Sequence, residues 1–322
     1  MKKKFFSPKI FLLICLIYVI SIAAINFGFI NSYWEGILKI ALINIILVVS
    51  LNLATGILGQ LSLAHSAFMA IGAYTSVMIT KFFTASGWLE FPFAVICGGL
   101  VAMFFAVFIS YPAMKIPGNY LLIITLAVNE IVRNFIINFN IAGGSTGCRG
   151  IAHYSNFSAV YIITVLIVGF IYLLIHSKYG RATICISQNE MLTKSCGVDT
   201  FSYKIATFSL AAFFAGIAGG LFAHELLVIE PNMFDYTYSL ELLAMVIIGG
   251  LGSISGSIIS AVIFTILPYT IEFILDIKLI IYLLAMILVI FYMPTGLFSD
   301  YKAMLTAIKQ RFLKKFSRGE KS

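Results

Sequence analysis

The chain has 322 residues, of which 61% are hydrophobic and 11% charged, and its formal net charge is +8. This composition excludes a water-soluble globule and is typical of a polytopic membrane protein. The basic residues gather near the ends of apolar runs, so the charge indicates membrane orientation and argues against a nucleic acid partner.

The apolar runs predict an all-α transmembrane bundle that forms a single domain over residues 1–298. Runs such as 121–128 and 261–267 are continuously apolar and lack the alternation of a membrane strand. Because a helix needs roughly 20 mostly apolar residues to cross the hydrocarbon core, we count about ten spans. They start near Ile10, Ile37, Leu61, Phe91, Tyr120, Val160, Ile205, Tyr238, Ser257 and Leu279.

Lysine and arginine positions predict the orientation, since cytoplasmic loops retain positive charge. With the start of the chain inside, the basic segment 177–204 is cytoplasmic, and only Lys81, Arg149 and Lys278 fall outside. The loop 224–239 has no lysine or arginine, which suits an exterior position. Both termini are therefore predicted to be cytoplasmic.

Both ends of the chain place basic residues beside apolar ones. Three lysines precede the apolar run 10–25, which resembles a secretory signal. Because more spans follow, we expect an uncleaved membrane anchor. At the other end, segment 299–322 has apolar residues at helical spacing with basic residues between them, which predicts an amphipathic helix on the anionic inner leaflet.

The sequence carries no signature of chemistry. Its five cysteines show no CxxC pair and no metal-ligand spacing. The glycine-rich segment 250–257 lacks the lysine of a phosphate loop, and there is no nucleophile with a base beside it. We therefore predict no catalytic residue, no metal and no cofactor.

The polar segment 177–204 is the most informative feature. Ser187 and Glu190 have the spacing of a capping box, which predicts a helix of about nine residues beginning there. Lys194 lies four residues after Glu190 in the favourable order, and Gly197 follows where a left-handed C-terminal cap is wanted.

The same helix carries apolar residues, including Met191 and Leu192, that need a surface to cover them. We interpret the segment as a docking handle for a soluble partner. The alternative is a helix on the lipid surface that merely joins two spans.

Glycines and polar residues interrupt two spans at comparable places, after the second and the eighth. Gly-broken hydrophobic segments indicate the central site of a transporter. Both breaks are predicted on the cytoplasmic side, which suggests a parallel internal duplication; the alternative is close helix packing through small residues. The helix-break glycines are Gly56 and Gly59, and Gly249, Gly250, Gly252 and Gly256.

Glu130 and Arg133 lie three residues apart within the fifth span. Each charge near the membrane centre raises the free energy of insertion by roughly 2.5 to 3.5 kcal/mol, and each large apolar residue lowers it by only about 0.3 to 0.6 kcal/mol. The cost of the two charges therefore nearly cancels the gain from all the large apolar residues of this span. We expect this helix to face other protein or a wet cavity, with the two charges paired with each other or with a neighbouring helix. A structural ion pair is favoured over direct solute contact.

The cytoplasmic segment resembles the EAA-type coupling loop of ABC importers, in which a glutamate is followed seven residues later by a glycine. In that family the loop is a short helix seated in a cleft of the ATPase subunit. This chain departs from the pattern at Met191 and Leu192, where two small residues are common, and at Ser187 and Gln188, where basic residues are common. The resemblance implies ATPase coupling by Arg181, Ser187, Glu190, Met191, Leu192, Lys194 and Gly197.

Six blocks in order resemble the branched-chain amino acid permeases of ABC importers, specifically the longer of the two permease types; urea permeases share nearly the same blocks. The resemblance implies a bacterial inner-membrane subunit that provides half of a translocation path. Its expected partners are a shorter homologous permease, two ATPase subunits, an extracytoplasmic substrate-binding protein and the bilayer. The blocks are 51–74, 116–133, 142–151, 179–182, 239–257 and 293–298.

Such a path must pass a small polar solute without trapping it, so uncharged polar side chains are more suitable than fixed charge. A self-sufficient ion-coupled carrier is the alternative of another class, but Glu130 is its one candidate coupling-ion site and the polar handle would then be unexplained. The candidate path residues are Asn52, Gln60, Ser62, His65, Thr125, Asn129, Glu130 and Arg133.

Overall fold

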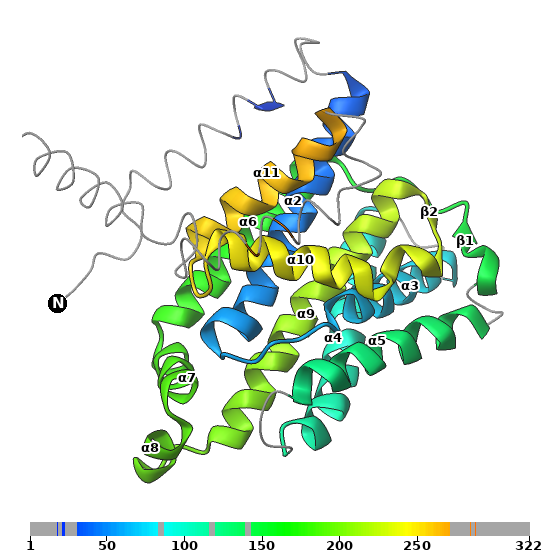
Figure 1. The fold of residues 1–322 in the computed structure, drawn as a ribbon. Coiled ribbons are helices and arrows are strands. Elements are labelled where there is room, and N and C mark those ends of the chain that lie inside the picture. Colours follow the sequence, from blue (N-terminus) through cyan, green and yellow to red (C-terminus); the bar gives the residue numbers. More distant parts are fainter. Residues whose placement is uncertain are drawn as a thin grey trace, which may run out of the picture.

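The computed structural model describes residues 31–82, 87–115, 120–138 and 143–270, together with a few isolated positions (Figure 1). The predicted spans near Ile10 and Leu279 lie almost wholly outside the described residues, as do the block 293–298 and the tail 299–322.

The described chain is mostly helical, and it follows the predicted apolar windows closely. Its long helices are α2 (Ser32–Asn52), α3 (His65–Phe82), α4 (Gly87–Ala113), α5 (Tyr120–Asn138), α6 (Phe157–His176), α9 (Thr200–Leu226), α10 (Tyr236–Gly249) and α11 (Ile254–Thr270). The short elements are the π-helical turn η1 (Leu53–Ile57), η3 (Gly144–Thr146), β1 (Cys148–Arg149), α7 (Lys178–Gln188), α8 (Glu190–Ser195), β2 (Val228–Ile229) and η4 (Pro231–Phe234).

Five of these helices are long and apolar enough to cross a membrane, which confirms the prediction of a helical membrane protein. They are Ser32–Ile57, Glu90–Ala113, Tyr120–Asn138, Phe157–His176 and Thr200–Leu226. By contrast α10 has 14 residues, and at about 1.5 Å per residue it spans only about two thirds of a hydrocarbon core about 30 Å thick.

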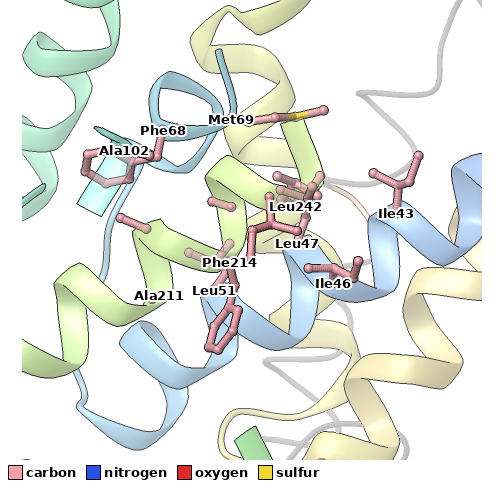
Figure 2. Packing of buried hydrophobic residues seen from close by; sticks show 14 of the residues in the cluster. Ile43, Ile46, Leu47, Leu51, Phe68, Met69, Ala102, Ala211, Phe214 and Leu242 are labelled. Atoms are coloured by element: carbon pink, nitrogen blue, oxygen red, sulfur yellow. The ribbon is translucent and has the colours of Figure 1, made fainter. Parts of the chain in front are cut away.

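Helix α9 lies at the centre and packs most extensively against α4 and α3, then against α2. Small residues permit this closeness: a Cβ atom on Gly72 of α3 would collide with the Gly216 backbone, and one on Gly219 would collide with the Met69 carbonyl. Between these contacts the core is filled by apolar side chains such as Leu47, Phe68 and Phe214 (Figure 2). Such packing is how helices associate where no water drives them together.

The two ends of the bundle differ in structure. At one end α7 and α8 project from the bundle between α6 and α9 (Figure 1). At the opposite end β1 and β2 pair antiparallel, with Cys148 opposite Ile229. Lys81, at the end of α3, donates a hydrogen bond of 2.9 Å to the Arg149 carbonyl and so ties this strand pair to the bundle.

Candidate coupling and translocation elements

The part of segment 177–204 that projects from the bundle is residues 177–199, because α9 begins at Thr200; from here on these residues are called the handle. The handle is anchored to the bundle at its start. Ser177 caps α7 by accepting a hydrogen bond from the Gly180 amide at 3.3 Å. Arg181 donates to the His176 carbonyl at 2.8 Å, at the end of α6. The ring of Tyr179 stacks on Tyr203 of α9, with centroids 4.4 Å apart. Arg181 therefore stabilises the α6–α7 corner.

The predicted capping box at Ser187 is wrong. Ser187 lies in the last turn of α7 and donates to the Ile184 carbonyl at 2.9 Å. Asn189 caps α8 instead, because its extended backbone brings its Oδ1 atom 3.0 Å from the Leu192 amide. The handle is thus two helices with a corner at Asn189, and the second has six residues where about nine were expected.

Glu190 has a tertiary role in place of the predicted backbone cap. Its carboxylate pairs with Lys194 at 3.0 Å, as the spacing predicts, and with Lys204 of α9 at 2.6 Å. It also accepts a hydrogen bond of 3.2 Å from Thr200. The hydrogen bond from Lys204 lowers the pKa of Glu190 to about 2, with partial burial opposing the shift and Lys194 adding to it. The ionised glutamate therefore holds α8 against α9.

Gly197 ends α8 as predicted. Its φ of 80° is left-handed, and its amide donates to the Lys194 carbonyl at 2.9 Å. Nothing lies within 4 Å of the position that a Cβ would take, so the backbone conformation alone requires glycine.

Met191 and Leu192 form an apolar tip on the handle. Their side chains are exposed, at 82% for Met191 and 66% for Leu192. Two adjacent, strongly exposed apolar residues on a projecting six-residue helix leave an uncovered apolar surface, as the sequence predicted.

The two glycine breaks, far apart in the sequence, lie together. A Cβ on Gly56 would collide with the Gly252 amide nitrogen. Asn52 fastens the contact: its amide nitrogen donates to the Ser253 carbonyl at 3.1 Å and to the Ser257 hydroxyl at 2.7 Å, and its oxygen accepts from the Gly252 amide at 2.8 Å.

The second break is itself a tight helix corner. Gly250 and Gly252 have left-handed φ values of 109° and 79°, and a Cβ on Gly249 would lie 2.7 Å from the Gly256 backbone. Close packing through small residues, the alternative that the sequence left open, is therefore what these glycines provide.

Most of the uncharged candidate path residues are buried and form hydrogen bonds within the chain. Ser62, His65, Thr125 and Asn129 are all buried. Their partners lie within the chain: His65 Nε2 and Ser50 Oγ are 2.8 Å apart, Thr125 accepts from the Leu63 amide at 3.0 Å, Asn129 and Ser66 bond at 2.8 Å, and Ser62 accepts from the Ala64 amide at 3.3 Å. Asn52 belongs to the same class. Gln60 keeps partial exposure.

The predicted pairing of Glu130 and Arg133 is confirmed. Arg133 Nη1 lies 3.1 Å from Glu130 Oε2, and the side chains are 28% and 31% exposed. The pair therefore lies at the border between the buried side of α5, which carries Thr125 and Asn129, and its open side.

The open side of α5 differs from those of its neighbours. Strongly exposed residues on α4 include Ile96, Phe104 and Phe108, and those on α6 include Leu166 and Phe170, so both faces suit lipid. On α5, by contrast, exposed Ile123, Ile131 and Phe135 alternate with exposed Asn134 and Asn138 and with the half-exposed Glu130. Polar groups at membrane depth are costly against lipid, so this face suits protein or water.

A buried ion pair that was not predicted from the sequence lies at the strand end of the bundle. Lys39 Nζ in α2 lies 2.9 Å from Glu225 Oε1 in α9, with side chains only 6% and 8% exposed, and 3.5 Å from Glu35. It also donates to the Ser155 carbonyl at 3.5 Å. Two features of the sequence could have indicated that Lys39 forms an ion pair. It is a lone lysine within an apolar span, where a charge needs a partner, and Glu35 lies four residues before it.

Within the part of the chain that the structure describes, no group of three or more histidine, cysteine or acidic residues is arranged to hold a metal ion.

Sequence comparison shows the family. Residues 33–290 match the family described as "Branched-chain amino acid transport system / permease component". The chain belongs to this family. It is 31% identical to the Salmonella typhimurium high-affinity branched-chain amino acid transport system permease protein LivM and 30% identical to that of Escherichia coli, in each case over 70% of this chain and 60% of the relative.

The matched region thus spans about 60% of the length of these two relatives. The Escherichia coli permease protein LivH is 24% identical over 78% of this chain and 90% of its own length. No solved structure matched the chain.

Proposed function

We propose that the chain is a permease subunit of a bacterial inner-membrane ABC importer, providing half of the translocation path for branched-chain amino acids. In this proposal it performs no chemistry, and partner ATPases drive it through the handle. In the orientation that the basic residues predict, both termini and the handle are cytoplasmic, so the handle meets the ATPase and the strand end faces the substrate-binding protein. Family membership and the names of the relatives support the substrate class.

The observation that carries the proposal is the apolar tip of the handle. Met191 and Leu192 extend from a helix that is held to α9 by the ionised Glu190. A helix lying on lipid would bury its apolar side chains in the interface along its length. A six-residue helix that is attached to α9 through the contact between Glu190 and Lys204 suits insertion into a cleft of a soluble protein.

The mixed face of α5 supports the second half of the proposal, that the path forms between two permease subunits. The face carries Glu130, paired with Arg133, and Asn134 and Asn138, whose amides donate to carbonyls of the same helix. Even when paired in this way, charged and amide side chains are costly to expose to lipid. A homologous permease placed there would cover the apolar part and leave the polar part facing a wet path.

The test is uptake of radiolabelled leucine by the assembled transporter with Met191→Ser and Leu192→Ser combined. We expect uptake to fall by at least about tenfold, because docking surfaces depend on a few buried apolar residues, while the subunit remains inserted and stable. Cys185→Ser is the matched control, since Cys185 is exposed on the adjacent helix α7, and it should transport normally.

The result also separates the alternatives. Uptake that survives in the double variant, or in cells lacking every ABC ATPase, would favour an ion-coupled carrier. Uptake of urea in place of leucine by the unaltered transporter would assign the chain to the urea or short-amide permeases while leaving the coupling proposal intact.

A further inference from the structure

We propose that residues 53–64, the π-turn segment, relay movement of the handle to the α10–α11 break, and that Asn52 is the positioning residue that makes this relay work. The segment comprises η1 and the loop that leads to α3. This inference rests on the proposed function, because it concerns how ATPase-driven movement would reach the membrane helices.

The π-turn segment touches the handle directly. Gly59 has a left-handed φ of 77°, and a Cβ placed on it would lie 3.1 Å from the Ser187 Cβ. Ser187 is in the last turn of α7, beside the corner from which α8 extends. A displacement of the handle toward the bundle therefore pushes on this segment at once.

At its start the segment is fixed to the second glycine break by Asn52. The three hydrogen bonds of this amide reach Gly252, Ser253 and Ser257, about 200 residues away in the sequence. The close approach of Gly56 to Gly252 leaves no space for a side chain. The segment and the α10–α11 corner must consequently move together.

At its far end the segment reaches the polar side of α5. The Leu63 amide donates to Thr125 at 3.0 Å, and α3 begins immediately afterwards at His65, which bonds back to Ser50 of α2 at 2.8 Å. One segment of twelve residues thus joins the handle to the α10–α11 corner and to the helix that bears Glu130.

In the relay that we propose, the π-turn and an ordinary α-helical turn are the two arrangements of this segment. A π-turn holds one more residue than an α-turn, and such turns are frequently found at functional sites. Converting it to α-helix would advance the following chain by one residue, about 1.5 Å along the axis with a rotation of about 100°. Coupling between distant sites requires an element of this two-state kind.

The experiment compares Asn52→Ala with Asn44→Ala in the complete transporter, reconstituted with its ATPases and binding protein. Asn44 is the matched control because it is also a buried amide on α2 that bridges to α11 and α10, bonding Thr265 at 2.9 Å and Tyr238 at 2.8 Å. ATP hydrolysis and leucine uptake are measured on the same vesicles.

We expect Asn52→Ala to keep ATP hydrolysis within about twofold while leucine transported per ATP falls by about fivefold or more, in the range of typical coupling energies. Asn44→Ala should leave that ratio unchanged, whatever it does to the amount of folded protein. An equal effect of the two variants on the ratio would overturn the relay.

A second pair of variants keeps the test decisive if Asn52→Ala does not assemble. Ser187→Phe enlarges the residue that faces Gly59, and Gln188→Phe enlarges its exposed neighbour. The relay requires uncoupling by the first and not by the second; the reverse result, or none, would count against it. If the unaltered complex shows no ATP-dependent uptake at all, the proposed function itself fails.

Discussion

A lysine–glutamate pair lies near each end of helix α9, and the two pairs differ in their exposure to water. Near the start of α9, Lys204 lies 2.6 Å from Glu190 of the handle; the lysine side chain is 10% exposed and the glutamate side chain 39% exposed. In its last turn Glu225 holds Lys39 of α2 at 2.9 Å, and both side chains are less than 10% exposed.

The first pair attaches the handle at a place that water reaches, and the second pair joins two helices where water does not reach. Water reaches the Glu190 side of the first pair although Lys204 is buried, so we expect this pair to contribute less to stability than a pair that is buried on both sides. A dry pair that loses one partner leaves an uncompensated charge, so α2 and α9 stay joined at the strand end. The handle end of the bundle is therefore the less firmly held of the two ends.

The largest expected effect on stability comes from breaking the buried pair of Lys39 and Glu225. Lys39→Met should lower the free energy of unfolding by about 3 to 5 kcal/mol, because Glu225 is left buried without its lysine. Thermal unfolding of the purified protein in detergent measures this. Adding Glu225→Met should restore much of the loss, since both charges are then removed; a double variant no more stable than the single would contradict the interpretation.

A middle-sized effect is expected at the cap of the handle. Gly197→Ala should cost about 1 to 2 kcal/mol of local stability, because alanine is strained at a left-handed φ. Gly169→Ala is the control: this glycine is in α6, and nothing lies within 4 Å of its Cβ position either. Hydrogen exchange of segment 190–200 should rise in the first variant and stay unchanged in the second. Equal exchange in both would show that backbone strain is absent at Gly197.

A smaller effect is expected from loosening the attachment itself. Lys204→Met should cost only about 0.2 to 1 kcal/mol, since Glu190 is partly exposed and keeps Lys194. Hydrogen exchange should increase in α8 alone while the midpoint of thermal unfolding stays unchanged. A drop in that midpoint as large as for Lys39→Met would erase the contrast between the two ends.

The smallest effect is the response of the handle to pH. Because the pKa of Glu190 is lowered from 4.5 to about 2, its stabilisation of the handle is complete above pH 4.5 and is lost as the pH falls toward 2. Hydrogen exchange of α8, corrected for the intrinsic rate, should increase over this window. In Glu190→Gln it should be higher at neutral pH and independent of pH; a persistent pH response in that variant would assign the titration to another group.

Features that depend on residues close together in the sequence were predicted correctly. The apolar runs located the long helices, the spacing of Glu190 and Lys194 predicted their ion pair, and Gly197 was identified as a left-handed cap. The capping box failed because Ser187 and Glu190 each had a better partner: the serine bonds within α7, and the glutamate meets Lys204 across a helix boundary.

Contacts between residues far apart in the sequence could not be predicted from it. Asn52 was predicted to line a path because an uncharged amide in a span suits that role. Its partners near Gly252 are set by how α2 packs on α11, which no local pattern shows. Lys39 was overlooked for the same reason, since Glu225 lies far from it along the chain.

The glycine contacts of α9 have a mechanical consequence. With backbones of α3 and α9 touching at Gly72 and Gly216, and again at Met69 and Gly219, these helices have no clearance to slide past one another. Helix α9 has 27 residues and is therefore about 40 Å long, so α3 and α9 form one block that reaches from the handle to the strand pair. In the proposed importer, changes in helix packing would then occur outside this block.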